Sequence, residues 1–257
     1  MLGVGVGLGR PSSMVQAAAA ASYTTTARDF DGTNDYYTRS TLAAANSKVG
    51  VFSIWTNTSS LDGNGQYIDS DGQNFRVNHD MAGIQFFAKN PSSVTKLLVT
   101  LDDAAVGGGG VTTDSTGVWL HILFGWNLGT GDKVMVLNGV DVTADCFIST
   151  FNNDVLDWSE AINWYVGIRS AGGLGFNGCV SDFYLNVAEY IDFTNADNIA
   201  LFIDSNGKPV DLGADGSTPT GTQPAIYFQG GAVPNLGYAG SFTETGATES
   251  CASSPSD

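Results

Sequence analysis

The chain is poor in charged residues, and especially in basic ones. Its 257 residues include 10 Lys and Arg against 26 Asp and Glu, so the formal net charge is −16. Only 14% of the residues are charged, against about 25% in an ordinary globular protein. A surface this negative repels phosphate backbones, and we therefore expect no binding of nucleic acid through a basic face.

Long apolar runs are also missing. No uninterrupted stretch approaches the roughly 18 apolar residues of a membrane-spanning helix, so we expect no membrane insertion. The 42% of hydrophobic residues argue against disorder over the whole length. Glycine, by contrast, is abundant: there are 33, close to twice the usual share of about 7%. The sequence predicts one large domain with appendages.

Cysteine is scarce and its spacing is uninformative. Cys146, Cys179 and Cys251 are an odd number and form no CxxC pair, which argues against the disulfide framework of a small secreted protein. We expect free, buried thiols in a reducing compartment. A bridge between Cys146 and Cys179 is the alternative, because two strands of a sandwich could bring them together.

Residues 1–26 are small, apolar and almost uncharged. A signal peptide is the obvious rival interpretation, but the segment lacks a positive n-region and its glycines break the apolar run. A Gly/Ala-rich segment has too little side chain to order itself against its own entropy. We therefore interpret it as an arm that attaches to another surface, with anchors at alternate positions: Leu2, Val4, Val6 and Leu8.

Between residues 27 and 192, short apolar runs alternate with clusters of Gly, Asn, Asp and Ser, as is typical of sandwiches and barrels. The most specific local signal is Asn138-Gly139 between residues 133–137 and 140–142, which predicts a type I′ hairpin. The other predicted strands are residues 49–55, 66–69, 75–78, 83–88, 95–101, 119–126, 165–168 and 179–185. A weak helical period is confined to residues 195–203. Strands without intervening helices indicate antiparallel pairing in two stacked sheets.

Three fragments, in this order, carry a family resemblance. They are residues 30–36 (FDGTNDY), residues 119–121 followed by 134–140, and residues 166–169 followed by 176–184. Together they resemble the concanavalin A-like jelly roll of laminin-G and pentraxin modules, over about two thirds of the chain. Leu120 stands in place of a usual His and Ser181 in place of an Asp, and neither change affects the architecture. Gly178 suits a bulge or a close strand crossing.

The resemblance implies an all-β fold, an antiparallel two-sheet jelly-roll sandwich over residues 27–192. An extended N-terminal arm, residues 1–26, would precede it, and an irregular C-terminal extension, residues 193–257, would follow. The Gly-rich extension and the Gly/Ala-rich opening resemble segments of tailed-phage virion proteins. This implies a virion structural protein of the head or of a tail fibre or spike, assembled in the host cytoplasm, with other virion proteins and copies of itself as partners.

The same resemblance supports an alternative, a carbohydrate-binding adhesin that contacts glycans of the host surface. A glycoside hydrolase is a third and less favoured function, because such enzymes need two carboxylates at a set separation. The glutamates are Glu160, Glu189, Glu244 and Glu249, and none belongs to the ExDxxE strand of the glucanases on this fold. We also find no strand with acids at positions i and i+2 beside a Trp-lined run. The sequence therefore predicts no catalytic residue.

Asp69 and Asp71 are the candidate Ca²⁺ ligands, since residues 69–74 (DSDGQN) place oxygens at alternate positions. The glycine is fourth here, whereas an EF-hand loop needs it sixth, so a hairpin turn is the favoured interpretation and no cofactor is expected. His79 and His121 are isolated, which argues against a zinc site.

Three aromatic residues are the candidate glycan platforms: Tyr67, Trp158 and Trp164, which lie near Asn or Asp in the sequence. Aromatic rings beside amide and carboxylate acceptors suit the stacking of a sugar face. The alternative is that these side chains fill the core, because one sandwich needs several large apolar residues.

Overall fold

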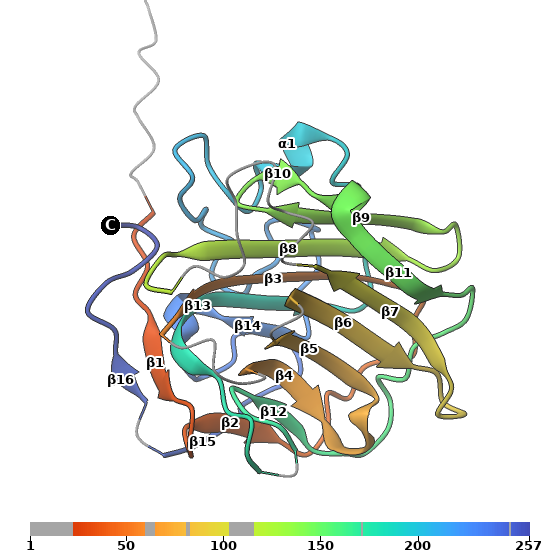
Figure 1. Ribbon diagram of the computed structural model, residues 1–257, viewed down its shortest axis with the longest axis horizontal. Helices are drawn as coiled ribbons and strands as arrows, with labels where there is room; N and C mark the ends of the chain where they lie inside the picture. The colour runs from red at the N-terminus through yellow and green to blue at the C-terminus, as the bar shows by residue number, and fades with distance from the viewer. Residues whose placement is uncertain (1–22, 60–64, 81–82, 103–115, 171, 247) are drawn as a thin grey trace, which may run out of the picture.

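The computed structural model describes residues 23–59, 65–80, 83–102, 116–170, 172–246 and 248–257. These residues form sixteen strands in two eight-stranded sheets and one short α-helix, α1 (Ala196–Ile199). The strand pairs are antiparallel, and the two sheets form the layers of a sandwich (Figure 1). The predicted all-β jelly-roll sandwich is confirmed. No helix among these residues is long and apolar enough to cross a membrane.

The first sheet, called sheet A, has the strand order β10-β9-β8-β3-β13-β1-β16, with β14 paired to β13. Its strands are β1 (Arg28–Asp31), β3 (Val49–Thr58), β8 (Leu120–Asn127), β9 (Asp132–Leu137), β10 (Val140–Asp141), β13 (Asn177–Asn186), β14 (Ile226–Phe228) and β16 (Glu249–Ser250). The predicted hairpin joins β9 to β10, and Asn138 and Gly139 both have positive φ, 48° and 81°. Both angles fit the type I′ turn.

The second sheet, called sheet B, has the order β11-β7-β6-β5-β4-β12-β2-β15. Its strands are β2 (Tyr36–Arg39), β4 (Gly65–Ser70), β5 (Phe75–Asp80), β6 (Gly83–Lys89), β7 (Thr95–Leu101), β11 (Cys146–Phe151), β12 (Trp164–Val166) and β15 (Thr243–Thr245). The sequence did not predict β11, because this edge strand is largely exposed and Phe147 is 68% accessible. It therefore lacks the alternation of buried and exposed side chains that marks a half-buried strand.

The main core lies between the sheets and is rich in aromatic rings. Phe52 of β3 contacts Phe86 of β6 with ring centroids 5.3 Å apart, which joins the two layers. Gly50 is required beside this core, because a Cβ there would lie 2.1 Å from the Trp126 ring. Gly178 has a φ of 144°, and a Cβ would lie 2.3 Å from the carbonyl oxygen of Asn57. Gly178 therefore allows a close approach between the backbones of the paired strands β13 and β3.

A second apolar cluster covers the outer face of sheet A. Val51 and Leu123 from the sheet pack there with Phe193, Phe202 and Leu212 from the C-terminal region. In addition, β14 adds to sheet A, β15 to sheet B and β16 to sheet A. Residues after 192 are therefore part of the packed sandwich, and the predicted boundary at 192 does not separate two packing units.

The cysteine prediction is wrong for two of the three residues. Cys179 of β13 and Cys251 form a disulfide, and Cys146 is the free cysteine. Strand β16 pairs with β1, and β1 pairs with β13, so the two sheet neighbours of β1 bring both sulfurs together. The sequence carried no local signal for this pairing, because it depends on where residues 249–251 return to the sheet.

Candidate functional site

The turn between β1 and β2 is built by its own carboxylates. The Asp31 Oδ1 atom accepts hydrogen bonds from the backbone nitrogens of Thr33 at 2.7 Å and Asn34 at 3.0 Å. The Asp35 Oδ2 atom accepts one from the Asp31 nitrogen at 3.2 Å. The hydrogen bonds from Asn34 and Thr33 lower the pKa of Asp31, because they stabilise its charged form. Asp31 is thus a fixed carboxylate at one end of the sandwich.

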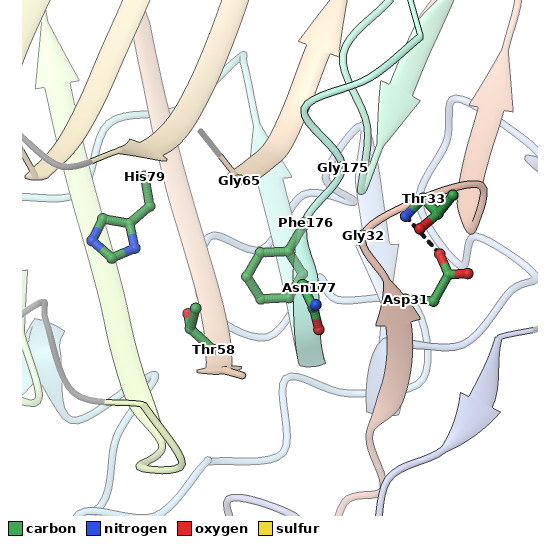
Figure 2. A pocket seen from close by; sticks show the side chains of 9 residues that line it. All are labelled: Asp31, Gly32, Thr33, Thr58, Gly65, His79, Gly175, Phe176 and Asn177. Atoms are coloured by element: carbon green, nitrogen blue, oxygen red, sulfur yellow. Dashed lines mark hydrogen bonds between the residues drawn. The ribbon is translucent and has the colours of Figure 1, made fainter. Parts of the chain in front are cut away.

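A polar pocket of about 230 Å³ opens beside this turn. Its lining includes the side chains of Asp31, Thr33, Thr58, Phe176 and Asn177, as Figure 2 shows. They come from the ends of β1, β3 and β13 and the adjoining loops, so residues far apart in the sequence meet there. Behind the pocket, the Phe176 ring lies against the core, where it is 1% accessible. Hydroxyl, amide and carboxylate groups therefore surround a small hollow on an apolar base.

A second pocket, of about 490 Å³, shares Asp31 with the first. Its lining includes four carboxylates, Asp29, Asp31, Asp35 and Glu249, which we call the acidic rim. Asp29 and Glu249 are direct partners across the β1–β16 pair. The pKa of Asp29 is raised mainly by partial burial, and repulsion from Asp35 and Glu249 raises it further. Within one pocket, the pKa of Asp29 is raised while that of Asp31 is lowered.

The acidic rim includes a pair of acids that the sequence pattern did not single out. Asp29 and Asp31 occupy positions i and i+2 of β1, and the inward Phe30 lies between them. The alternation in residues 29–31 (DFD) was a signal for two acids on one face of a strand. This strand has no tryptophan beside it, and Glu249 lies in the region predicted as an irregular C-terminal extension, so neither belonged to the expected pattern of catalytic acids.

The chemical groups of the acidic rim limit which ligands it could bind. Hydrogen-bond acceptors outnumber donors there, which suits either a hard cation such as Ca²⁺ or a ligand rich in hydroxyl groups. Carboxylate oxygen of Asp29 also lies within 4.8 Å of both sulfurs of the Cys179–Cys251 disulfide. Sulfurs joined in a disulfide are not thiolates, so this trio does not make a zinc site.

The three predicted glycan platforms lie in the core, which contradicts that prediction. Tyr67 and Trp158 are 1% accessible and Trp164 is 0% accessible. Trp158 and Trp164 stack on each other with centroids 6.0 Å apart, and Trp158 Nε1 donates to Ser47 Oγ at 3.1 Å. Their ring faces are therefore occupied by other side chains, as the alternative interpretation expected.

The Ca²⁺ candidates are bonded to different partners. Asp69 is fully buried on β4, and its Oδ2 atom accepts a hydrogen bond from the Ser170 nitrogen at 3.1 Å. Asp71 begins the turn between β4 and β5 and accepts a hydrogen bond from Asn163 Nδ2 at 2.8 Å. Gly72 in this turn has a φ of 70°, and the hairpin-turn interpretation is confirmed. The predicted arm anchors Leu2, Val4, Val6 and Leu8 lie outside the described residues.

No protein-family model and no curated protein matches this chain. Among solved structures, it is similar to the heptameric SAP-like pentraxin of Limulus polyphemus, at 12% identity and a TM-score of 0.56. That match covers 90% of this chain and 96% of the pentraxin. The fold is a pentraxin-like jelly roll.

A second similar structure is a "putative carbohydrate binding protein" from Bacteroides ovatus. It shares 14% identity with this chain at a TM-score of 0.51, over 88% of this chain. This chain spans 59% of that protein's length. Both comparisons support the jelly-roll family resemblance of the sequence at the level of the fold.

Proposed function

We propose that this protein is a carbohydrate-binding module displayed on a phage particle. The observation that carries the binding function is the acidic rim with its adjoining polar pocket. Both hollows are rich in hydrogen-bond acceptors, and Asp31 belongs to both. A neutral saccharide supplies many hydroxyl donors, which suit pockets rich in hydrogen-bond acceptors. It also carries no negative charge, so a protein with a net charge of −16 does not repel it. The similar Bacteroides ovatus protein, described as a "putative carbohydrate binding protein", supports the choice.

A glycan array of the full-length protein tests binding. Asn177→Ala removes an exposed amide of the polar pocket, and Asp31→Asn removes the charge shared by both pockets. We expect each variant to weaken binding at least about tenfold, which corresponds to 1.4 kcal/mol. Phe147→Ala is the matched control, because this exposed ring lies on β11 and outside both pockets. A wild-type protein that binds no glycan contradicts the proposal.

The phage location is supported by the sequence alone, through the Gly/Ala-rich opening and the resemblance of the Gly-rich C-terminal region to virion proteins. Deletion of residues 1–21 should leave a folded protein that no longer joins particles. Normal incorporation of the truncated protein would contradict the arm hypothesis.

Self-association is a related proposal, and the heptameric state of the similar pentraxin is consistent with it. Light scattering of the full chain measures it directly.

Glycoside hydrolysis is the second candidate function, and one observation favours it. The acidic rim holds one carboxyl with a raised pKa, Asp29, and one with a lowered pKa, Asp31. Opposite shifts of this kind accompany the division of roles between a proton donor and a separate charged carboxylate. Release of reducing ends from polysaccharides, abolished by Asp29→Asn, would replace the binding proposal with an enzyme. Binding without release of reducing ends would exclude hydrolysis of the tested polysaccharides.

A further inference from the structure

A third pocket, of about 420 Å³, is partly built by the C-terminal tail, which we define as residues 249–257. Trp119 and Trp55 line it together with Asn138, Asn206 and Lys208, and residues 253–255 and 257 of the tail supply one side. No described residue lines both this pocket and either pocket at the acidic rim. Its size lies within the roughly 300–1,000 Å³ of small-molecule sites. We call it the Trp119 pocket.

Trp119 differs from the other tryptophans in its exposure. All five lie in the described part of the chain; the other four are at most 3% accessible, whereas Trp119 is half-buried. Its Nε1 atom donates to Ser253 Oγ at 3.2 Å, which orients the indole. Beside it, Val118 is 56% accessible, and Trp55 stacks on His121 at 4.5 Å. The pocket therefore contains an indole ring, that of Trp119, which is oriented by a hydrogen bond and partly exposed to solvent.

Polar groups surround this aromatic surface. The Asn138 Oδ1 atom accepts a hydrogen bond from the backbone nitrogen of His121 at 2.7 Å, which fixes the Asn138 amide at the β9–β10 turn. On the facing turn, Asn206 is exposed, and its amide nitrogen donates to Asp204 Oδ2 at 3.2 Å. The Lys208 ammonium is engaged by the Ser256 carbonyl of the tail. Amide groups thus border the apolar Trp119 ring, and the Lys208 ammonium has a hydrogen-bond partner within the protein.

We propose that the Trp119 pocket binds a pyranose ring of a neutral saccharide, stacked on the Trp119 indole. Sugar rings have one face of C–H groups and an edge of hydroxyl groups, which matches an aromatic surface bordered by amides. The net charge of −16 disfavours an acidic saccharide. This inference rests on the proposed carbohydrate-binding function and assigns it a subsite.

The tail that borders the pocket is tied to the sandwich at several points. The disulfide joins Cys251 to β13, and the Cys251 nitrogen donates to the Ala27 carbonyl at 3.1 Å. Further along, the Thr25 nitrogen donates to Ser256 Oγ at 3.0 Å. Because the disulfide restrains the tail, its removal should lower the affinity of the Trp119 pocket while the pocket's Trp55 side remains in place.

Affinity electrophoresis tests this proposal with the full chain in gels that contain hydroxyethylcellulose, galactomannan, glycogen or alginate. We expect at least one neutral polysaccharide to retard the protein and the acidic alginate to have no effect. Trp119→Ala should weaken the retardation at least tenfold, whereas Trp119→Phe, which keeps a ring, should retain most of it. Phe147→Ala, an exposed ring elsewhere, should leave it unchanged. The double variant Cys179→Ser/Cys251→Ser should weaken binding.

A second readout does not depend on the folding of any variant. Titration of the ¹⁵N-labelled wild-type protein with an oligosaccharide of the retarding polysaccharide should shift the indole Nε1–H resonance of Trp119. Absence of that shift at saturation, or full retardation of Trp119→Ala, overturns the subsite. If binding then depends on Asp31 and Asn177, the general carbohydrate-binding proposal stands. Retardation by alginate alone overturns the assignment to neutral saccharides, and no retardation by any polysaccharide counts against both proposals.

Discussion

At the scale of single residues, Trp158 and Trp164 stack on each other inside the sandwich, and Phe75 lies 4.9 Å from Trp158 between ring centroids. Large aromatic side chains contribute strongly to a core through the apolar area they bury. Their position in the sequence beside Asn and Asp resembles a glycan platform, but the packing gives them a structural role. Residue type and near neighbours alone did not distinguish the two roles.

Trp164→Ala should therefore lower the free energy of unfolding by about 3–5 kcal/mol, the usual cost of removing a large buried ring. Urea denaturation followed by circular dichroism measures this change. Phe147→Ala, at a 68% accessible position, should change it by less than about 0.5 kcal/mol. A Trp164→Ala protein with normal stability would show that the ring is not part of the core.

His121 is fully buried on β8, where its Nε2 atom lies 2.9 Å from Ser53 Oγ. Burial lowers its pKa from 6.5 to about 3. Below pH 6.5 the unfolded chain binds a proton at this residue while the folded chain does not, so acid favours unfolding. The stabilising effect of the neutral imidazole is complete above pH 6.5 and is lost progressively down to about pH 3.

Comparison of the wild type with His121→Gln isolates this effect, because glutamine does not titrate. Between pH 6.5 and 4, the wild-type free energy of unfolding should fall relative to the variant by about 1.4 kcal/mol for each pH unit. Urea denaturation at pH 7, 6, 5 and 4 measures the difference. A difference that stays constant over this range would mean that the folded His121 titrates normally.

At the scale of elements, the short strand β16 positions Cys251 for the disulfide. Its pairing of Glu249 with Asp29 places Cys251 next to β13, and the disulfide with Cys179 then closes a sequence separation of 72 residues. The same pairing completes the acidic rim. One two-residue strand therefore brings a crosslink and a carboxylate from the end of the chain to the first strand.

Loss of this disulfide should lower the free energy of unfolding by about 4 kcal/mol, because a loop of this length restricts the unfolded chain strongly. Urea denaturation of Cys179→Ser/Cys251→Ser measures the cost. Cys146→Ser is the matched control, since Cys146 forms no disulfide, and its effect should be smaller. Mass spectrometry of non-reduced peptides should recover the Cys179–Cys251 link; a Cys146–Cys179 link would contradict the structure.

At the scale of the whole molecule, the C-terminal region is part of the sandwich. Ile226 and Phe228 of β14 are fully buried in the main core, and Phe202 and Leu212 cover the outer face of sheet A. A chain that ends at residue 192 would expose both surfaces to water, at a cost of about 25 cal/mol for each Å² of apolar area.

Truncation at residue 192 should therefore give an insoluble or unfolded protein, as measured by soluble yield and circular dichroism. Removal of residues 252–257 is the matched control, because it spares β14, β15, β16 and the disulfide. A soluble, cooperatively folding protein of residues 1–192 would restore the predicted domain boundary.

The sequence by itself determined the local structure of this protein. Alternating apolar runs predicted most strands and Asn138-Gly139 predicted a hairpin, because strand periodicity and turn geometry depend on neighbouring residues. The jelly roll was implied by the resemblance of three fragments to a known family. The tertiary structure alone decided which tryptophans are buried, which cysteines pair, and that Asp29, Asp31, Asp35 and Glu249 share one pocket. These features depend on contacts between residues far apart in the chain, and the order of strands in the two sheets sets those contacts.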